Sequence, residues 1–141
     1  MTITSTALTD QSVRTEIGDV HRLVLADDHP LYRRGLAWAL TSSGRYEVVA
    51  EADNGGEALE AIRDQRPDLV VLDVRMPELD GLEVLHEMRA TGDETPVVLL
   101  SAFDEAQIVL AGMIEGATTF LNKELARHQL VGAIDDVFTE R

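Results

Sequence analysis

The sequence predicts an α/β fold of the doubly wound type, in which five strands and five helices alternate as (βα)5 in a three-layer sandwich. Short uninterrupted runs of Val and Leu recur along the chain, as in strands that are covered on both faces. Stretches with helical spacing separate these runs, and a helical crossover forces the strands that it joins to lie parallel. We expect strands at residues 22–26, 46–51, 68–73, 96–101 and 118–122.

The helical stretches carry their own start and stop signals. Pro30 suits the first turn of a helix, where its missing N–H is not needed. An Asn or Asp that precedes a Glu or Gln by three residues is a capping pattern. This pattern occurs in Asn54 with Glu57, Asp80 with Glu83, and Asp104 with Gln107. In the last stretch, one apolar helical face runs through Ala126, Leu130, Ile134 and Val137. These signals place a helix after each strand.

Length and composition describe one acidic domain. The 141 residues include 26 acidic and 12 basic ones, for a formal net charge of −14, and 45% are hydrophobic. A packed core is therefore expected, whereas a phosphate-binding nucleic-acid surface is not. The absence of cysteine excludes disulfides and zinc–thiolate sites. We expect a flexible N-terminal tail at residues 1–20, a domain at residues 21–141 and a cytoplasmic location, because no secretory signal or membrane-spanning stretch is recognisable.

Polar side chains follow the carboxyl ends of four predicted strands. In open α/β sheets, ligands bind beyond these ends. Because parallel strands all end at the same edge of the sheet, we expect the side chains there to converge on one rim. They are Asp27 and Asp28 after the first strand, Asp73 at the end of the third, Ser101 and Ala102 at the fourth, and Lys123 after the fifth.

Three carboxylates in one place need a counter-charge. Two unit charges about 4 Å apart repel by about 4 kcal/mol at an effective dielectric constant near 20, and a bound cation relieves this cost. Oxygen ligands suit a hard cation such as Mg²⁺, which commonly also binds phosphate oxygens. A carboxylate beside such a cation can attack phosphorus, while Ser101 and Lys123, the only lysine of the chain, bind phosphoryl oxygens.

Each of these residues also has an ordinary structural interpretation. An Asp pair after a strand is more often a turn or a helix cap than a metal site. Ser101 can cap a helix, a lone lysine is usually solvated, and Phe120 alone is a core residue. His29 can reach the site, but we expect it to cap the helix that begins at Pro30. The joint occurrence of these residues at four strand ends favours a functional site.

The pattern resembles the receiver domain of bacterial two-component response regulators, and its opening resembles the NarL/FixJ class. The resemblance covers the chain from Arg22 to about Phe138. It implies the flavodoxin-like strand order 2-1-3-4-5. It is carried jointly by the segments LVLADDHPLYRRGL, EADNGGEAL, PDLVVLDVRMPELDGLEVL, PVVLLSAF and GATTFLNK.

The resemblance implies a phosphoacceptor and a Mg²⁺ site. Asp73 matches the aspartate that takes the phosphoryl group. Asp28 matches the direct metal ligand, and Asp27 the carboxylate that acts on the metal through a water molecule. The backbone carbonyl of Arg75 matches the other protein ligand of the metal. The implied cofactor is Mg²⁺.

The resemblance also implies a conformational switch. Ser101 matches the hydroxyl that moves toward the phosphoryl group, and Lys123 the ammonium that pairs with a phosphate oxygen. Phe120 matches the aromatic residue that changes rotamer, and the small Ala102 leaves room for the phosphoryl group. The surface of helix 4, strand 5 and helix 5 would then change and serve as the signalling face.

These roles imply partners for the chain. The expected partner is a sensor histidine kinase, with a possible homodimer through the face formed by helix 4, strand 5 and helix 5. The expected output is a transcription-regulating DNA-binding domain that is missing here. We expect no direct binding of nucleic acid or membrane by this acidic chain, and no enzyme activity beyond its own phosphorylation and dephosphorylation.

Three other functions stay open at this point. A receiver-like module can act by interaction alone, without phosphorylation. A metal-dependent phosphohydrolase of the haloacid dehalogenase type needs a second Asp two residues after its nucleophile, and Arg75 stands there. A flavin or dinucleotide carrier needs free backbone N–H groups after the first strand, where Asp27, Asp28 and Pro30 disfavour phosphate.

Overall fold

The computed structural model describes residues 20–102 and 106–139. All but the last residue of the expected N-terminal tail at residues 1–20 lies outside this range. Asp104, the first residue of one expected capping pair, also lies outside it. Within the described part of the chain, no helix is both long and apolar enough to cross a membrane.

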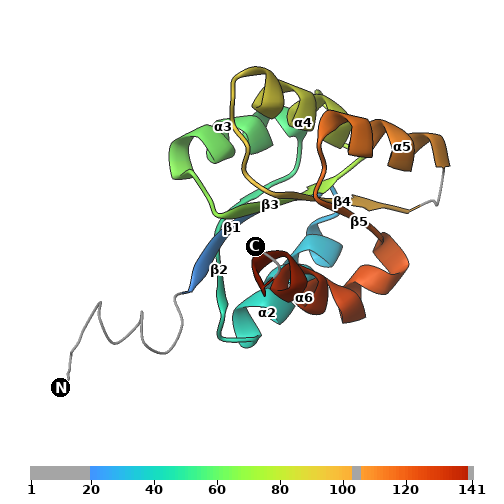
Figure 1. The fold of residues 1–141 in the computed structure, drawn as a ribbon. Coiled ribbons are helices and arrows are strands. Elements are labelled where there is room, and N and C mark those ends of the chain that lie inside the picture. Colours follow the sequence, from blue (N-terminus) through green and yellow to red (C-terminus); the bar gives the residue numbers. More distant parts are fainter. Residues whose placement is uncertain (1–19, 103–105, 140–141) are drawn as a thin grey trace.

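Five strands and five helices alternate along the described chain (Figure 1). The strands are β1 (His21–Ala26), β2 (Tyr46–Ala52), β3 (Leu69–Asp73), β4 (Val97–Ser101) and β5 (Thr119–Asn122). The helices are α2 (Pro30–Ser42), α3 (Gly55–Gln65), α4 (Gly81–Ala90), α5 (Ala106–Glu115) and α6 (Lys123–Thr139). All strand pairs are parallel, and the order in the sheet is β2-β1-β3-β4-β5. The predicted fold class and strand order are confirmed.

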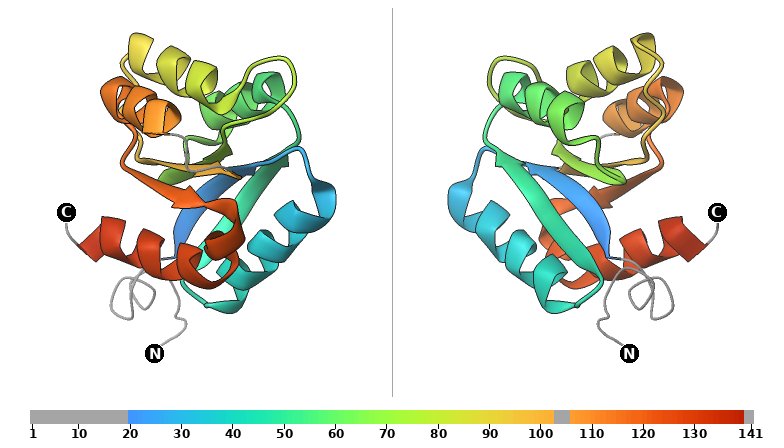
Figure 2. Two further views of the ribbon diagram at one scale, coloured as in Figure 1. Left: turned by 90° about the vertical axis from the view of Figure 1, so that its right-hand side faces the viewer. Right: turned by 90° about the vertical axis from the view of Figure 1, so that its left-hand side faces the viewer.

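The helices form two layers, one on each face of the sheet (Figure 2). Helices α3, α4 and α5 cover one face, and α2 and α6 cover the other. Successive residues of a strand point to opposite faces of the sheet. Val70 and Leu72 therefore pack under α3, α4 and α5, whereas Leu69 and Val71 pack under α2 and α6. Both faces are buried, which is why the strands are continuous apolar runs instead of alternating patterns.

Two of the predicted capping patterns form as expected. The Asn54 side chain accepts a hydrogen bond from the backbone N–H of Glu57 at 2.8 Å. Asp80 accepts from the backbone N–H of Glu83 at 2.8 Å, and the Glu83 carboxylate accepts from the backbone N–H of Asp80 at 2.9 Å. Such caps satisfy N–H groups that have no partner inside the helix. The second cap fixes the start of α4 next to the end of β3.

Gly81, the first residue of α4, lies against the backbone of Asp73. A Cβ atom at Gly81 would come within 2.4 Å of the carbonyl oxygen of Asp73 and 2.9 Å of the Cα of Val74. The backbone N–H of Gly81 donates to the carbonyl oxygen of Val74 at 2.7 Å. The loop after β3 is therefore closed tightly onto the strand end, and only glycine fits at this contact.

Substitution of this glycine tests the contact. We expect Gly81→Ala to lower the free energy of unfolding by about 1 to 3 kcal/mol, because backbone atoms must move to make room for the methyl group. Gly35→Ala in α2 is the matched control, since nothing lies within 4 Å of a Cβ there. The control should gain about 0.5–1 kcal/mol from the higher helix propensity of Ala. Urea denaturation measures both, and equal effects of the two substitutions would contradict the tight contact.

Candidate functional site

The register of the sheet brings the predicted residues to one rim. Ala26 of β1 pairs with Leu72 of β3, so the residues that follow, Asp27 and Asp73, lie side by side. Asp73 pairs in turn with Leu100 of β4, which places Ser101 one step beyond. Ser101 pairs with Asn122 at the end of β5, directly before Lys123. The predicted convergence is therefore confirmed by strand pairing.

The polar side chains at this rim are unusual because they are buried. Among the described residues, the buried polar or charged side chains are Asp27, Asp73, Ser101 and Lys123. Asp27 has no exposed surface, and Asp73 is 2% exposed. Burying charged groups is costly unless they are paired. A fold that buries two carboxylates side by side therefore needs strong local compensation.

The ammonium of Lys123 supplies that compensation. Its Nζ lies 2.7 Å from Oδ2 of Asp27 and 3.2 Å from Oδ2 of Asp73. Lys123 begins α6 directly after β5. Its side chain extends from the end of β5 across the rim to Asp27 after β1 and Asp73 at the end of β3. One positive charge thus bridges two negative ones, and the buried group keeps a net negative charge.

These contacts shift the pKa values of Asp73 and Lys123. Burial, and then the charge of Asp27, raise the pKa of Asp73, while Lys123 and the backbone N–H of Arg75 offset part of this increase. For Lys123, burial lowers the pKa, but the hydrogen bond to Asp27 and the charge of Asp73 outweigh it. The net pKa of Lys123 is therefore higher than usual, and the lysine stays charged. Asp73 is left with unrelieved repulsion.

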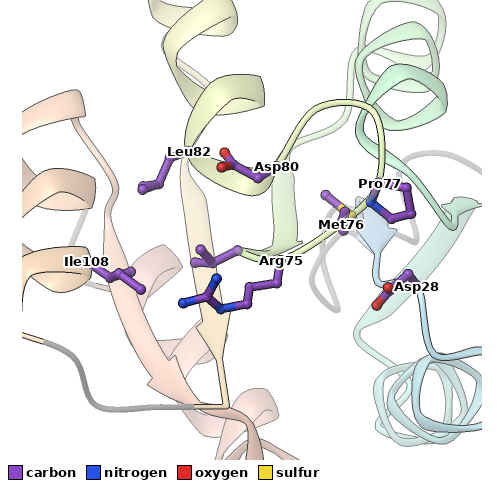
Figure 3. Close-up of a pocket in the computed structure, with 8 residues that line it drawn as sticks. Asp28, Arg75, Met76, Pro77, Asp80, Leu82 and Ile108 are labelled. Atoms are coloured by element: carbon purple, nitrogen blue, oxygen red, sulfur yellow. The ribbon is translucent and has the colours of Figure 1, made fainter.

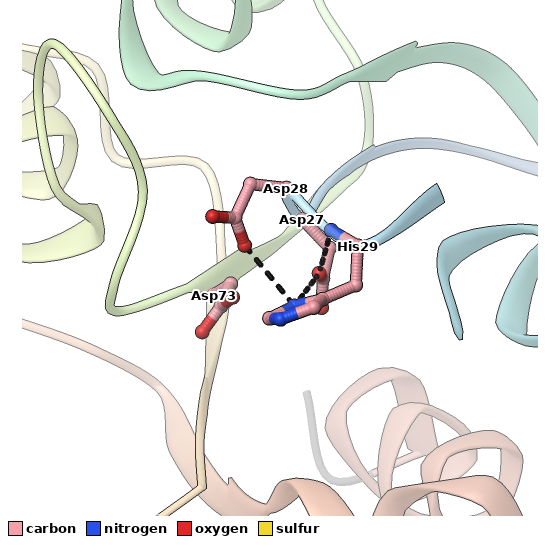
Figure 4. Close-up of side chains that lie close together, drawn as sticks. All are labelled: Asp27, Asp28, His29 and Asp73. Carbon is pink, nitrogen blue, oxygen red and sulfur yellow. Dashed lines mark hydrogen bonds and ion pairs between the residues drawn. The ribbon is translucent and has the colours of Figure 1, made fainter. Parts of the chain in front are cut away.

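His29 lies over the carboxylates. It occupies the N-cap position of α2, but its side chain makes no capping hydrogen bond, so the expectation that it serves as a cap is wrong for the ring. The ring Nδ1 lies 3.1 Å from Oδ1 of Asp28 and 3.2 Å from Oδ1 of Asp27 (Figure 4). The backbone N–H of His29 also donates to Oδ1 of Asp27 at 2.8 Å. The ring therefore belongs to the acidic site.

The acidic cluster has the donor set of a divalent-cation site. Potential ligand atoms of Asp27, Asp28, His29 and Asp73 all lie within 4.8 Å of one another. Two buried oxygens, Oδ2 of Asp27 and Oδ1 of Asp28, accept no well-directed hydrogen bond. Their close neighbours are the ion-pair contacts with Lys123 and His29. Oxygen atoms that are gathered in this way fit a hard divalent cation.

Tyr32 is a site residue that the sequence did not reveal. Its hydroxyl donates to the backbone carbonyl of Lys123 at 2.6 Å, and Nζ of Lys123 lies 4.5 Å from the centroid of its ring. Burial, and then the charge of Asp27, raise the pKa of Tyr32 to about 12, so the hydroxyl stays protonated and continues to donate. Tyr32 therefore attaches α2 to the start of α6 and places an aromatic face beside the ammonium.

Arg33, which follows Tyr32 in α2, contacts the chain directly after β1. Its Nη1 donates to the backbone carbonyl of Asp27 at 2.6 Å, and its Nε pairs with the carboxylate of Glu51 at 2.9 Å. No local sequence pattern indicates this role, because one partner follows β1 and the other lies in β2. The acid pair after β1 is thereby fixed by backbone contacts as well as by charge.

The remaining predicted residues are Arg75, Ala102 and Phe120. The backbone N–H of Arg75 donates to Oδ1 of Asp73 at 3.3 Å, and its side chain is exposed. Ala102 directly follows the buried Ser101 and is exposed. Phe120 is half-buried in β5 and packs against the core under α3, α4 and α5. Phe120 does not pair with Ser101 in the sheet register, since its partner is Leu99.

A pocket of about 630 Å³ opens beside the carboxylates. Figure 3 shows Asp28 on one side of it and Ile108 and Leu82 on the other, with the loop after β3 between them. The lining residues are Asp28, Val74, Arg75, Met76, Pro77, Asp80, Leu82 and Ile108. A group that enters from solvent can therefore approach the acidic cluster along the loop that follows Asp73.

The parallel sheet with an acidic rim at the carboxyl ends of its strands defines a receiver-type α/β domain, and comparison with known proteins agrees. The sequence matches the response regulator receiver domain over residues 23–135. The chain therefore belongs to the response regulator receiver domain family, whose members act in two-component signalling.

The relatives include mycobacterial regulators. The chain is 45% identical over 115 residues to NarL of Mycobacterium tuberculosis, named as a transcriptional regulatory protein; this match covers 82% of the chain and 53% of NarL. The solved signal receiver domain of the same NarL superposes with a TM-score of 0.82 at 43% identity, covering 86% of this chain and 98% of that one. The chain spans about half the length of the curated relatives that it matches.

A second solved structure carries ligands in its name. It is the CheX–CheY–BeF3–Mg²⁺ complex from Borrelia burgdorferi, which matches with a TM-score of 0.78 at 28% identity and covers 84% of this chain and 89% of that one.

The raised pKa of Asp73 has a consequence for stability. The folded protein binds the carboxyl proton of Asp73 more tightly than the unfolded chain does. The contribution of Asp73 to the free energy of unfolding therefore decreases with increasing pH. This decrease begins at the pKa of Asp73 in the unfolded chain and ends above its pKa in the folded protein. We expect Asp73→Asn to raise the free energy of unfolding of the metal-free protein by about 1 kcal/mol at neutral pH, and by less in acid. Lys123 keeps Asp27 as its partner in the variant.

Urea denaturation in the presence of a chelator, repeated between pH 4 and 8, measures this difference. Glu60→Gln on the exposed side of α3 is the control, and it should change stability by no more than about 0.5 kcal/mol. An Asp73→Asn protein that is less stable than the parent throughout the pH range would show that the carboxylate is well compensated, contrary to our interpretation.

Proposed function

We propose that the chain is a phosphorylation switch in which Asp73 accepts a phosphoryl group from a sensor histidine kinase with the help of Mg²⁺. The observation that carries this proposal is the buried pairing of Asp73 and Asp27 through one lysine at the rim of the sheet. Asp73 is a carboxylate with excess negative charge around it, next to a pocket that opens to solvent. Such a group gains from a cation and is positioned to act as a nucleophile.

The proposed Mg²⁺ ligands are Asp28, Asp73 and the backbone carbonyl of Arg75, with Asp27 acting through a water molecule. The donor set supports this assignment, because the carboxylate oxygens are close together and two of them lack a well-directed hydrogen bond. The CheY complex from Borrelia burgdorferi, with BeF3 and Mg²⁺ in its name, supports the same chemistry. The cation, when bound, neutralises charge on the phosphoryl oxygens and on the carboxylates.

In the proposed reaction, an Oδ atom of Asp73 attacks the phosphorus of a phosphohistidine. The P–O bond forms as the P–N bond breaks in line with it, and the imidazole nitrogen of the donor leaves with the electron pair and takes up a proton. Asp73 becomes an acyl phosphate. Lys123, already 3.2 Å from Asp73, pairs with one of the new phosphoryl oxygens. The exposed Ala102 leaves space for the group.

The proposed switch links this acyl phosphate to the surface. Ser101, buried at the end of β4, donates its hydroxyl to a phosphoryl oxygen, and Phe120 changes rotamer in response. The affected face consists of α5, β5 and α6, which correspond to helix 4, strand 5 and helix 5 of the sequence prediction. To invert a two-state equilibrium from 1:99 to 99:1, phosphorylation must favour the active state by about 5.5 kcal/mol. The proposed source of this free energy is the contacts that Ser101 and Lys123 make only when the phosphoryl group is present.

The proposed setting follows from the family and the relatives. We infer a histidine kinase as donor, a homodimer through the α5, β5 and α6 face, and a cytoplasmic location. The similarity to NarL supports a role in transcription regulation through a DNA-binding output domain, without contact between this acidic chain and DNA. We further infer that phosphoryl transfer is confined to Asp73 itself, because the residue two places later is Arg75, with an exposed side chain, instead of the second Asp of a phosphohydrolase.

Phosphorylation by a small donor tests the proposal. We expect acetyl phosphate with Mg²⁺ to add one phosphoryl group to the parent chain and none to Asp73→Asn, as measured by intact-protein mass spectrometry. Asp53→Asn is the control, since Asp53 is an exposed residue outside the cluster and its variant should be modified like the parent. Addition of a chelator should abolish the gain in mass.

Two results would contradict this proposal. A parent protein that gains no phosphoryl group would favour an interaction module that works without phosphorylation. Many turnovers of a chromogenic phosphate ester per protein molecule, lost in Asp73→Asn, would favour a phosphohydrolase.

A further inference from the structure

A groove of about 570 Å³ lies between helices α4 and α5. The two helices run next to each other on the same face of the sheet (Figure 1, Figure 2). Residues between Leu79 and Glu87 line one side of the groove, and residues between Ala111 and Glu115 line the other. The groove adjoins the pocket beside the carboxylates, because Asp80 and Leu82 line both.

The floor of this groove is apolar. Leu82 of α4 faces Ala111 and Ile114 of α5 across it. The side chain of Ile114 is 74% exposed, and the neighbouring Leu110 and Met113 are also exposed, so one side of α5 presents large apolar side chains to solvent. A surface helix normally presents polar residues there. A contiguous exposed apolar patch is typical of an interaction surface.

The charged groups along the rim of the groove are acidic. They are the carboxylates of Asp80, Glu83, Glu87 and Glu115. Among the residues that the structure describes, no Lys or Arg lines the groove. The carboxylate of Glu87 is exposed, and within the described chain it has no ion-pair partner. The rim therefore keeps an excess of negative charge beside an apolar floor.

Contacts between the two helices hold the groove in shape. Nδ1 of His86 on α4 lies 3.0 Å from Oε1 of Glu115 on α5. Arg89, near the end of α4, donates from Nη2 to the backbone carbonyl of Gly116, directly after α5, at 2.9 Å. The ends of both helices are thus joined on either side of the chain that links them. A ligand that enters a pre-formed groove loses less affinity to ordering of the protein.

The charge of the rim selects the occupant. A second copy of this chain carries a net charge of −14, and its residues 1–19 contain three acidic residues and one Arg. Like charges that face each other across an interface oppose binding. Nucleic acids and anionic lipids are disfavoured for the same reason. A partner with Lys or Arg beside apolar side chains complements both the rim and the floor.

The shape of the groove favours a helical occupant. Side chains of one helix pack into the grooves that other helices form, and an amphipathic helix in an apolar groove is a recurring mode of recognition. The lining from Asp80 to Glu87 corresponds to about two turns of α4. An occupant of two to three turns therefore matches its length.

We propose that the groove between α4 and α5 is the docking site of a basic amphipathic helix of a partner protein. The apolar face of this helix packs on Leu82, Ala111 and Ile114, and its Lys or Arg side chains pair with Glu83 and Glu87. This inference goes beyond the proposed function and does not need phosphorylation of Asp73.

Titration of the whole chain into a labelled peptide, followed by fluorescence anisotropy, tests the proposal. The probe is a peptide of about 14 residues, or about four helical turns, with Leu at the i, i+3, i+4 and i+7 positions of one face and Lys elsewhere. An ionic strength of about 0.1 M screens charges that lie more than about 10 Å away. We expect this peptide to bind more tightly than a peptide of the same composition whose order forms no apolar face.

Matched variants of the chain locate the binding. We expect Ile114→Gln to weaken binding about tenfold and Glu87→Lys about fivefold or more. Leu31→Gln is the control for the first, because Leu31 is exposed on α2, on the other face of the sheet. Glu60→Lys is the control for the second, since it makes the same change of net charge on the exposed side of α3. Both controls should stay within about twofold of the parent.

Three results would overturn the proposal, with each variant first checked for the parent's circular dichroism. The first is equal binding of the two peptides. The second is an equal effect of a groove variant and its control, which would mean that net charge or another surface holds the peptide. The third is self-association of the parent in sedimentation experiments that is lost in Ile114→Gln, which would make a second copy of the chain the occupant.

Discussion

The ammonium of Lys123, held between the carboxylates of Asp27 and Asp73, is the interaction on which the site depends. The strand pairing places these two acids side by side and the helical layers bury them, so their repulsion is built into the fold. One positive charge between two negative ones stabilises the arrangement only in part. In the proposed function, a cation offsets the remaining negative charge and Asp73 acts as the nucleophile.

The rest of the molecule positions these three groups. Tyr32 and Arg33, both on α2, bind the backbone carbonyls of Lys123 and Asp27, respectively. Gly81 lets α4 begin directly against the backbone of Asp73. The strand ends, the helix after β1 and the loop after β3 are thus joined by main-chain contacts. The elements that surround Asp73, namely α2, α4 and the loop after β3, are therefore in contact with the groups that a change of charge at Asp73 affects.

Much of this could be predicted from the sequence, because the signals are local. Runs of Val and Leu gave strands that agree with the structure within one residue at each end, and the acids and the lysine follow strands whose ends must meet. The role of Tyr32 was missed, because its partner Lys123 lies 91 residues away and the contact depends on how α2 packs on α6. The ring of His29 was assigned to a cap, because the sequence does not show which way a side chain at a helix start turns. The roles of Ser101 and Phe120 as switch residues stay predictions.

The most direct test of this account is the titration of the Asp73 carboxyl group, followed by ¹³C NMR of selectively labelled protein with and without Mg²⁺. The account predicts a pKa above the ordinary aspartate value in the absence of the cation, and a clear decrease when Mg²⁺ is added. A carboxyl group that titrates in the ordinary range in the absence of the ion and does not respond to it would show that the rim holds no excess charge, and the proposed chemistry would lose its basis.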